Sequence, residues 1–140
     1  MRVAALDYGK ARIGVAVSDE LGLLAHPRPP IAARDRRAAL AAIRQLHADE
    51  GIERFLVGLP LRLGGEAGKA ADEATRFAQS VSNATGCEVE MVDERWSTVQ
   101  ASRALHDSGV RSKEQRSRID SAAAAVILQA WLDGSGSSRR

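Results

Sequence analysis

The stretch that decides the fold of this 140-residue chain is RVAALDYGKARIGVAVS, residues 2–18. It holds two short, mostly apolar runs, Arg2–Asp7 and Arg12–Ser18, separated by a few residues that include Gly9. Apolar runs of this length around a glycine-containing turn are typical of two β-strands joined as a hairpin. We therefore predict an antiparallel pair at the start of the chain, with Asp7 at the carboxyl end of its first strand.

The remaining elements follow from changes in hydrophobic period along the chain. A third strand is expected near residues 23–26, broken by Pro27, Pro29 and Pro30. Further strands are expected over 52–57 and 88–92, and helices over 35–50, 69–84, 99–107 and about 118–132. Short turns make the first three strands antiparallel, whereas intervening helices make the later strands parallel. The expected fold is α/β, a mixed five-stranded sheet with helices on both faces, in one domain (1–133) with a disordered tail (134–140).

Composition excludes several classes of protein. One cysteine, Cys87, allows neither an internal disulfide nor a cysteine-based zinc cluster, and we expect it to be a small core residue. No apolar run approaches the roughly 20 residues that span a bilayer, and the start of the chain does not resemble a signal peptide. We expect a cytoplasmic protein without a membrane partner.

The net charge of +2 conceals an uneven distribution of charge. Residues 95–118 carry six basic and two acidic side chains, and residues 26–44 carry five arginines and one aspartate. Residues 49–94 reverse this balance, with ten acidic and four basic side chains. Such segregation is typical of a surface that binds a polyanion, although solvated, arginine-rich helix faces produce the same pattern.

Three acidic residues lie where such a fold binds ligands. Asp7 and Glu94 follow the first and fifth predicted strands, so both belong to carboxyl ends and face one cleft if those strands are neighbours. Asp120 precedes the apolar stripe of the last helix, and the small residues after it let the backbone approach the sheet. Carboxylate oxygens favour Mg²⁺ or Mn²⁺, and a pair of such ions promotes phosphodiester hydrolysis.

Each of these acids also has a simpler interpretation. Asp7 is a possible turn-former before Gly9, and Glu94 a possible salt-bridge partner of Arg95. Asp120 has the charge that a helix N-terminus favours. Carboxylates that converge without cations repel one another strongly, so a meeting of all three would favour the metal site.

Four blocks of the sequence resemble the YqgF (RuvX) family. They are LDYG with RIGVAVSD (6–9 and 12–19), VGLPL (57–61), DERWSTVQA (93–101), and IDSAA with ILQ (119–123 and 127–129). The blocks follow one another with the family's spacing from about residue 2 to residue 133. The resemblance implies an RNase H-like fold related to Holliday-junction resolvases, and a nuclease that matures the 5′ end of pre-16S ribosomal RNA.

The same resemblance implies roles for individual residues. Asp7, Glu94 and Asp120 are expected to bind two catalytic Mg²⁺ or Mn²⁺ ions, with Asp93 as the alternative to Glu94. Trp96 replaces the family's usual smaller apolar residue, and we expect it to pack rather than to stack on a base. Phosphate contacts are expected from the basic residues of these blocks and of the segment before Asp120: Lys10, Arg12, Arg95, Arg111, Lys113, Arg116 and Arg118.

The leading hypothesis is a metal-dependent endonuclease for precursor RNA, acting as a monomer or weak homodimer. A resolvase-like nuclease for branched DNA is the alternative among enzymes, and a non-catalytic RNA-binding module is the alternative outside them. The presence of all three acids favours catalysis. An exposed Trp131 would weakly indicate a dimer face.

Overall fold

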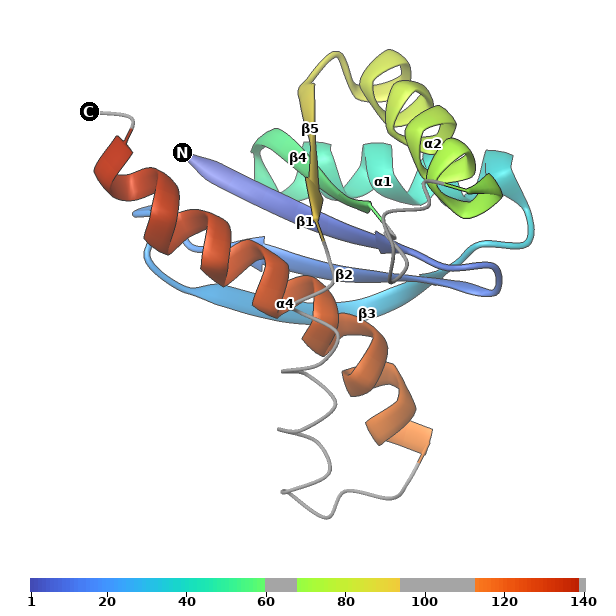
Figure 1. The fold of residues 1–140 in the computed structure, drawn as a ribbon, viewed down its shortest axis with the longest axis horizontal. Helices are drawn as coiled ribbons and strands as arrows, with labels where there is room; N and C mark the ends of the chain where they lie inside the picture. Colours follow the sequence, from blue (N-terminus) through green and yellow to red (C-terminus); the bar gives the residue numbers. More distant parts are fainter. Residues whose placement is uncertain (60–67, 94–112, 139–140) are drawn as a thin grey trace.

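The computed structural model describes residues 1–59, 68–93 and 113–138 (Figure 1). The elements in chain order are β1 (Arg2–Tyr8), β2 (Arg12–Ser18), β3 (Ala25–Ala32), α1 (Arg36–Glu50), β4 (Ile52–Leu59), α2 (Lys69–Thr85), β5 (Glu88–Asp93) and α4 (Lys113–Ser138). This is the predicted order. The helix expected over 99–107 lies outside the described residues.

The five strands form one mixed sheet in the order β3-β2-β1-β4-β5. β1 pairs antiparallel with β2 and parallel with β4, so the pairing changes direction at β1, as predicted. β5 pairs in parallel with β4 and lies outside it. The condition that the first and fifth strands be neighbours is therefore not met. The crossover through α1 places β4 directly beside β1, which leaves β5 only the outer edge of β4.

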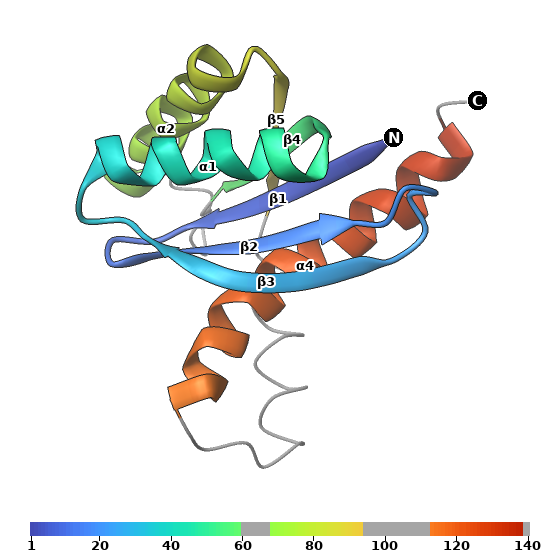
Figure 2. The same cartoon turned by 180° about the vertical axis from the view of Figure 1, so that it is seen from behind.

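Helices cover both faces of the sheet: α1 and α2 pack on one face, and α4 crosses the other (Figures 1 and 2). Because side chains alternate along a strand, β1 contributes to both cores. Ala4 and Leu6 lie in the core beneath α1 and α2, whereas Val3 and Ala5 lie in the core beneath α4. Cys87 is buried in the first of these cores, as expected. None of the described helices is long and apolar enough to cross a membrane.

β3 continues through the three prolines that were expected to break it. It is an edge strand, where a residue without an N–H group is tolerated. The β2–β3 register also shifts between the pairs Ile13–Ile31 and Val15–Arg28, so that a bulge takes up Pro29 and Pro30. The prolines therefore alter the strand without ending it.

α4 is longer than predicted at both ends. It begins at Lys113, within a stretch expected to be irregular, and continues through residues 134–138, which were expected to be a disordered tail. Among the α4 residues whose burial the structure describes, the buried apolar ones are Ala123, Ala124, Ile127 and Leu128, of which Ala123 and Ile127 belong to the predicted stripe. Helical hydrogen bonds propagate from such a docked centre into polar flanks. A single domain over residues 1–133 stays a prediction.

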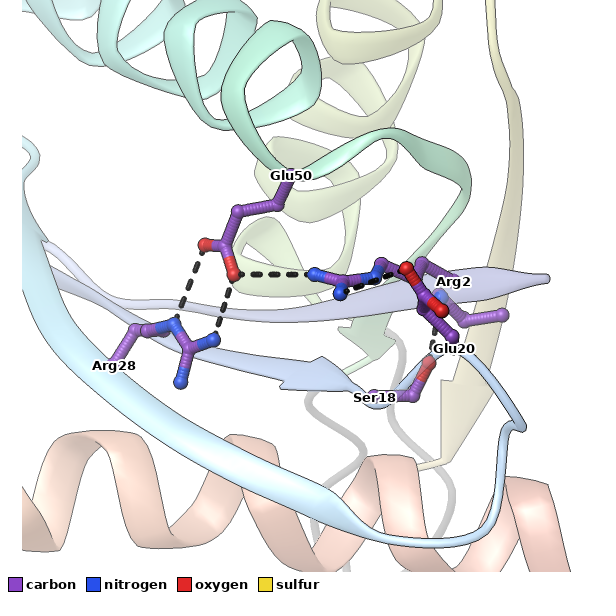
Figure 3. Close-up of polar contacts among 6 residues, drawn as sticks. Arg2, Ser18, Glu20, Arg28 and Glu50 are labelled. Atoms are coloured by element: carbon purple, nitrogen blue, oxygen red, sulfur yellow. Dashed lines mark hydrogen bonds and ion pairs between the residues drawn. The ribbon is translucent and has the colours of Figure 1, made fainter.

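A network of charged side chains joins β3, β1 and the end of α1 (Figure 3). The Arg28 guanidinium donates two hydrogen bonds to the Glu50 carboxylate, with N–O distances of 2.6 and 3.3 Å. Arg2 contacts both Glu50 and Glu20 over longer distances, 3.8 and 3.6 Å. The hydrogen bonds from Arg28 hold the pKa of Glu50 below its usual value. Beside this network, the buried Ser18 hydroxyl accepts a hydrogen bond from the backbone N–H of Val3.

We expect Glu50→Gln to lower the free energy of unfolding by about 1 kcal/mol at pH 7, because the charge-assisted bonds to Arg28 are partly screened by solvent. A carboxyl whose pKa is lower in the folded state stabilises the fold above its unfolded pKa of about 4.3. That contribution is lost as the pH falls through the lower, folded value. Urea unfolding at pH 7 and pH 3 is the measurement, with the exposed Glu20→Gln as control. A difference between wild type and Glu50→Gln that stays equal at both pH values would contradict the assignment.

Candidate functional site

Asp7 is the penultimate residue of β1 and lies on the face of the sheet that α4 covers. Alternation groups it with Val3 and Ala5, which lie in the core beneath α4. The next residue, Tyr8, belongs to the opposite face and stacks on Phe77 of α2, with ring centroids 4.5 Å apart. This stacking anchors the end of the strand and holds Asp7, which is half-buried, on the α4 side.

Both strands beside β1 carry a glycine next to Asp7. Asp7 pairs with Gly14 of β2. On the other side Leu6 pairs with Val57 of β4, so the next position in the register, beside Asp7, is Gly58. The positions directly opposite Asp7 on both neighbouring strands therefore carry no side chain. A glycine inside a strand often marks a place where a ligand or another backbone approaches closely.

The turn after Asp7 does not depend on the Asp7 side chain. The turn is closed by the backbone, with the N–H of Gly9 donating to the carbonyl oxygen of Arg12 at 3.0 Å. A Cβ atom at Gly9 would lie 2.7 Å from that oxygen, so the turn requires glycine. Within the described part of the chain, no group donates a hydrogen bond or forms an ion pair with the Asp7 carboxylate. The structure therefore does not support the interpretation of Asp7 as a turn-former.

Basic side chains border Asp7 at the same edge of the sheet. Lys10 and Arg12 are exposed on the β1–β2 turn, where residues 9–12 line a shallow hollow of about 320 Å³. The N–H of Ala33 donates to the carbonyl of Ala11 at 2.9 Å, which ties the end of β3 to this turn. Two of the residues predicted to contact phosphate thus lie close to Asp7 along the chain and at the same edge.

Ser121 joins α4 to the bulge between β2 and β3. Its hydroxyl accepts from the N–H of Val15 at 3.4 Å and donates to the carbonyl oxygen of Arg28. These two residues form the first pair after the shift in register, beside Pro29 and Pro30. The buried hydroxyl therefore links backbone groups of two strands at the irregular point of the sheet, and it fixes α4 there.

A second polar contact fixes the same helix at the start of β3. The Gln129 side chain accepts from the N–H of Ala25 and donates to the carbonyl oxygen of Leu23, both at 2.9 Å. Gln129 follows Ser121 by eight residues, about 12 Å along a helix. Two such contacts set both the rotation and the position of α4 along the sheet.

Asp120 directly precedes Ser121, so the contacts of Ser121 determine where its backbone lies. It is the eighth residue of α4. The favourable effect of a helix N-terminus on a negative charge is confined to about the first turn. The macrodipole therefore does not explain an acid at this position.

The other predicted site residues are described in part or not at all. Glu94, Arg95, Trp96 and Arg111 lie outside the described residues. For the acids Asp93 and Asp120 and the basic residues Lys113, Arg116 and Arg118, the structure describes the place on β5 or α4 but not the side chain. Among the described residues no three His, Cys, Asp or Glu side chains gather as a metal site would need. Of the predicted acids, only Asp7 has a described side chain.

Trp131 packs within its own chain. Its indole N–H donates to Glu90 of β5 at 2.9 Å, and its ring lies 6.0 Å from the Arg54 guanidinium. The half-buried ring gives no indication of a dimer face.

Sequence reasoning missed the glycines beside Asp7 and the role of Ser121. Gly14 and Gly58 were visible as glycines within or at the end of apolar runs, but their place beside Asp7 depends on strand order and register. Ser121 was recognised only as one of several small residues. Its position as a polar residue at the start of an apolar helical stripe was the available signal.

The comparisons with known proteins agree with one another. A family model described as "RuvX: Holliday junction resolvase" matches residues 1–134. A protein of Anaeromyxobacter sp. (strain Fw109-5) named "Putative pre-16S rRNA nuclease" is 43% identical over 134 residues, covering 96% of this chain and 98% of the relative. A protein of Chloroflexus aurantiacus with the same name is 42% identical over 131 residues, covering 94% and 86%.

Two solved structures share the fold at low sequence identity. RuvC of T. thermophilus in complex with a Holliday junction substrate superposes with a TM-score of 0.58 at 17% identity, covering 97% of both chains. The fowlpox virus Holliday junction resolvase gives 0.57 at 9% identity, covering 96% of this chain and 99% of the other. These likenesses confirm the predicted RNase H-like fold.

Proposed function

Since the chain belongs to the RuvX family of Holliday junction resolvases, we propose that it is a divalent-metal-dependent endonuclease that processes the 5′ end of pre-16S ribosomal RNA. Family membership makes the chain a nuclease, a hydrolase of phosphodiester bonds. The metal dependence, the site residues and the RNA substrate are the proposed parts. A ribosomal RNA precursor as substrate also favours a cytoplasmic location.

The observation that carries the proposal is that the Asp7 carboxylate has no described partner in its surroundings. This half-buried carboxylate lies at the strand end where pairing changes direction, flanked by Gly14 and Gly58, and no described residue neutralises it. Leaving a partly buried charge without a partner is costly, and a bound cation would remove that cost. An oxygen ligand in uncrowded surroundings fits Mg²⁺ or Mn²⁺.

We assign Glu94 rather than Asp93 as the second ligand on the basis of strand alternation. In β5 the odd-numbered Val89 and Met91 contact the core beneath α1 and α2, whereas Val92 contacts the core beneath α4. Asp7 lies on the α4 face. If this alternation continues past Val92, the acid on the Asp7 face is the even-numbered one, and we therefore propose Glu94 rather than Asp93 as the ligand.

β4 separates β1 from β5, which therefore lie about 9.5 Å apart in two strand spacings. Gly58 of β4 lies in register between Asp7 of β1 and Val92 of β5, and it carries no side chain. Asp120, fixed through Ser121 on the same face, is the third proposed ligand. A pair of divalent cations held there would activate a water and stabilise the leaving oxygen of a phosphodiester.

The chain's basic residues orient the nucleic acid. Lys10 and Arg12 project from the turn that follows Asp7, where a phosphate can be held against their positive charge. We propose the same role for Arg95, Arg111, Lys113 and Arg116. RNA is the favoured substrate because curated relatives at about 40% identity are named as nucleases of pre-16S rRNA. Branched DNA is the second candidate, which the family's description and the junction-bound RuvC fold support.

We expect cleavage of a labelled RNA that carries the 5′ precursor sequence of 16S rRNA in Mn²⁺ or Mg²⁺, and no cleavage after chelation with EDTA. Restoring the cation should restore the activity, because the metal is bound and not covalently attached. A four-way DNA junction in the same assay tests the second candidate. Cleavage that persists in EDTA would contradict the metal site, and cleavage of the junction alone would replace the RNA substrate by DNA.

A further inference from the structure

The face opposite α4 carries a basic groove that the proposed site does not use. The groove lies between α1 and α2 and has a volume of about 540 Å³. Its lining residues are Arg37, Leu40, Arg44, Ser80, Asn83 and Ala84. None of them is acidic. Among these lining residues, the charged ones are therefore the two arginines, and Leu40 and Ala84 are the apolar ones.

The two arginines are available to a ligand. Both are exposed, and their guanidinium groups form no ion pair within the described part of the chain. Nearby acids have other contacts: Asp35 caps α1 by accepting from the N–H groups of Arg37 and Ala38, and Asp49 accepts from Gln45. On the α2 side, Asn83 uses its carbonyl oxygen to accept from Gln79, which leaves its amide N–H groups as donors. The polar groups that remain in the groove are mainly donors.

The spacing of the arginines suits a sugar–phosphate backbone. Arg37 and Arg44 are two turns apart on one side of α1, about 10.5 Å along the helix axis. Phosphates of one strand in a duplex rise by about 3.4 Å each, so this distance spans about three of them. A polyanion can therefore engage the two guanidinium groups through different phosphates of one strand.

The start of α1 leads from the edge that carries Asp7 to this groove. β3 ends at that edge, and the N–H of Ala33 is bound to the β1–β2 turn. Two exposed arginines, Arg34 and Arg36, follow at the start of α1, and Arg37 is the next residue. Positive charges thus run from Lys10 and Arg12, past the start of α1, into the groove.

From this geometry we propose that the groove between α1 and α2 is a second binding site for the phosphate backbone of the nucleic-acid substrate. The proposal rests on the proposed function, because it takes the substrate at the Asp7 edge to be nucleic acid. Substrate that extends from the edge across the start of α1 reaches Arg37 first and Arg44 second. Short substrates occupy only the edge and do not reach the groove.

The test measures binding in the Asp7→Asn background, which keeps the RNA intact. Fluorescent single-stranded RNAs of ~6 and ~24 nucleotides are titrated at several salt concentrations. We expect Arg37→Ala/Arg44→Ala to weaken binding of the long RNA roughly tenfold or more. It should also reduce the slope of log K against log salt by about 1.4, since each phosphate contact on a single strand contributes about 0.7. Binding of the short RNA should not change.

Two further variants serve as controls. Arg37→Lys/Arg44→Lys keeps both charges and should retain the salt slope. Arg37→Gln/Arg44→Gln, which also removes both charges, replaces the alanine pair if that variant does not fold. Arg2→Ala removes a positive charge at the opposite edge of the sheet and should leave the binding of both RNAs unchanged. Unchanged binding of the long RNA by the alanine variant would overturn the second site and leave the proposed function intact. Failure of the Asp7→Asn parent to bind either RNA would overturn the proposed function.

Discussion

Replacing Asp7 by asparagine will lower the rate of phosphodiester cleavage by at least about a thousandfold, or about 4 kcal/mol in activation free energy. Asparagine keeps the size of the side chain and removes the negative charge that we propose as a metal ligand. Without added metal, the thermal midpoint should be no lower than that of the wild type, because no described residue loses a partner when this charge is removed. Single-turnover cleavage in Mn²⁺ and a thermal melt of the same preparation measure both quantities.

The matched control is Asp49→Asn. Asp49 is an exposed aspartate near the end of α1, at the opposite edge of the sheet, and its carboxylate accepts only from Gln45. The same chemical change there should leave cleavage within about twofold of the wild type, as expected for a surface substitution. Equal activities of the two variants would remove Asp7 from the active site.

Replacing Ser121 by alanine will affect both stability and catalysis. The substitution leaves the buried N–H of Val15 and the carbonyl of Arg28 without the hydroxyl that joins them, at a cost of about 2 kcal/mol or more. Because Asp120 is the preceding residue, a displacement of the helix by about 1 Å should also lower the cleavage rate, by roughly a hundredfold. The Mn²⁺ concentration that gives half-maximal activity should rise.

Gln129→Ala separates these two effects. It removes the other polar contact between α4 and β3, so it should lower the free energy of unfolding as well. Its distance from Asp120 should leave the Mn²⁺ requirement close to that of the wild type. Ser121 acts only through stability if the two variants lose cleavage and metal affinity in the same proportion.

Most of the fold could be predicted from the local pattern of apolar and polar residues. The two apolar runs around Gly9 predict the β1–β2 hairpin, and alternation between helical and strand periods predicts the later βα order. β3 was predicted too short, because the tolerance of an edge strand for proline depends on a sheet position that the local sequence does not contain. The ends of α4 were missed because serine, glycine and charged residues there show no apolar period.

The candidate site could be predicted from the sequence only in part. The positions of Asp7 at a strand end and of Asp120 beside the last apolar stripe follow from the chain itself. The neighbours of Asp7 do not, because Gly14 and Gly58 come to lie beside it only through the order and register of β2, β1 and β4. The same long-range pairing places β4 between β1 and β5, which the local sequence does not determine.

The contact of Ser121 also orders the assembly of the enzyme in time. Its hydroxyl needs an N–H from β2 and a carbonyl from β3 already held side by side, and Ser121 is separated from Arg28 by 93 positions in the chain. Closing so long a stretch of chain costs more entropy than closing the β1–β2 hairpin, so we expect the contact to form after that hairpin. On the proposed assignment, Asp120 therefore takes its place only once β2 and β3 are paired, and a chain without that pairing lacks this metal ligand.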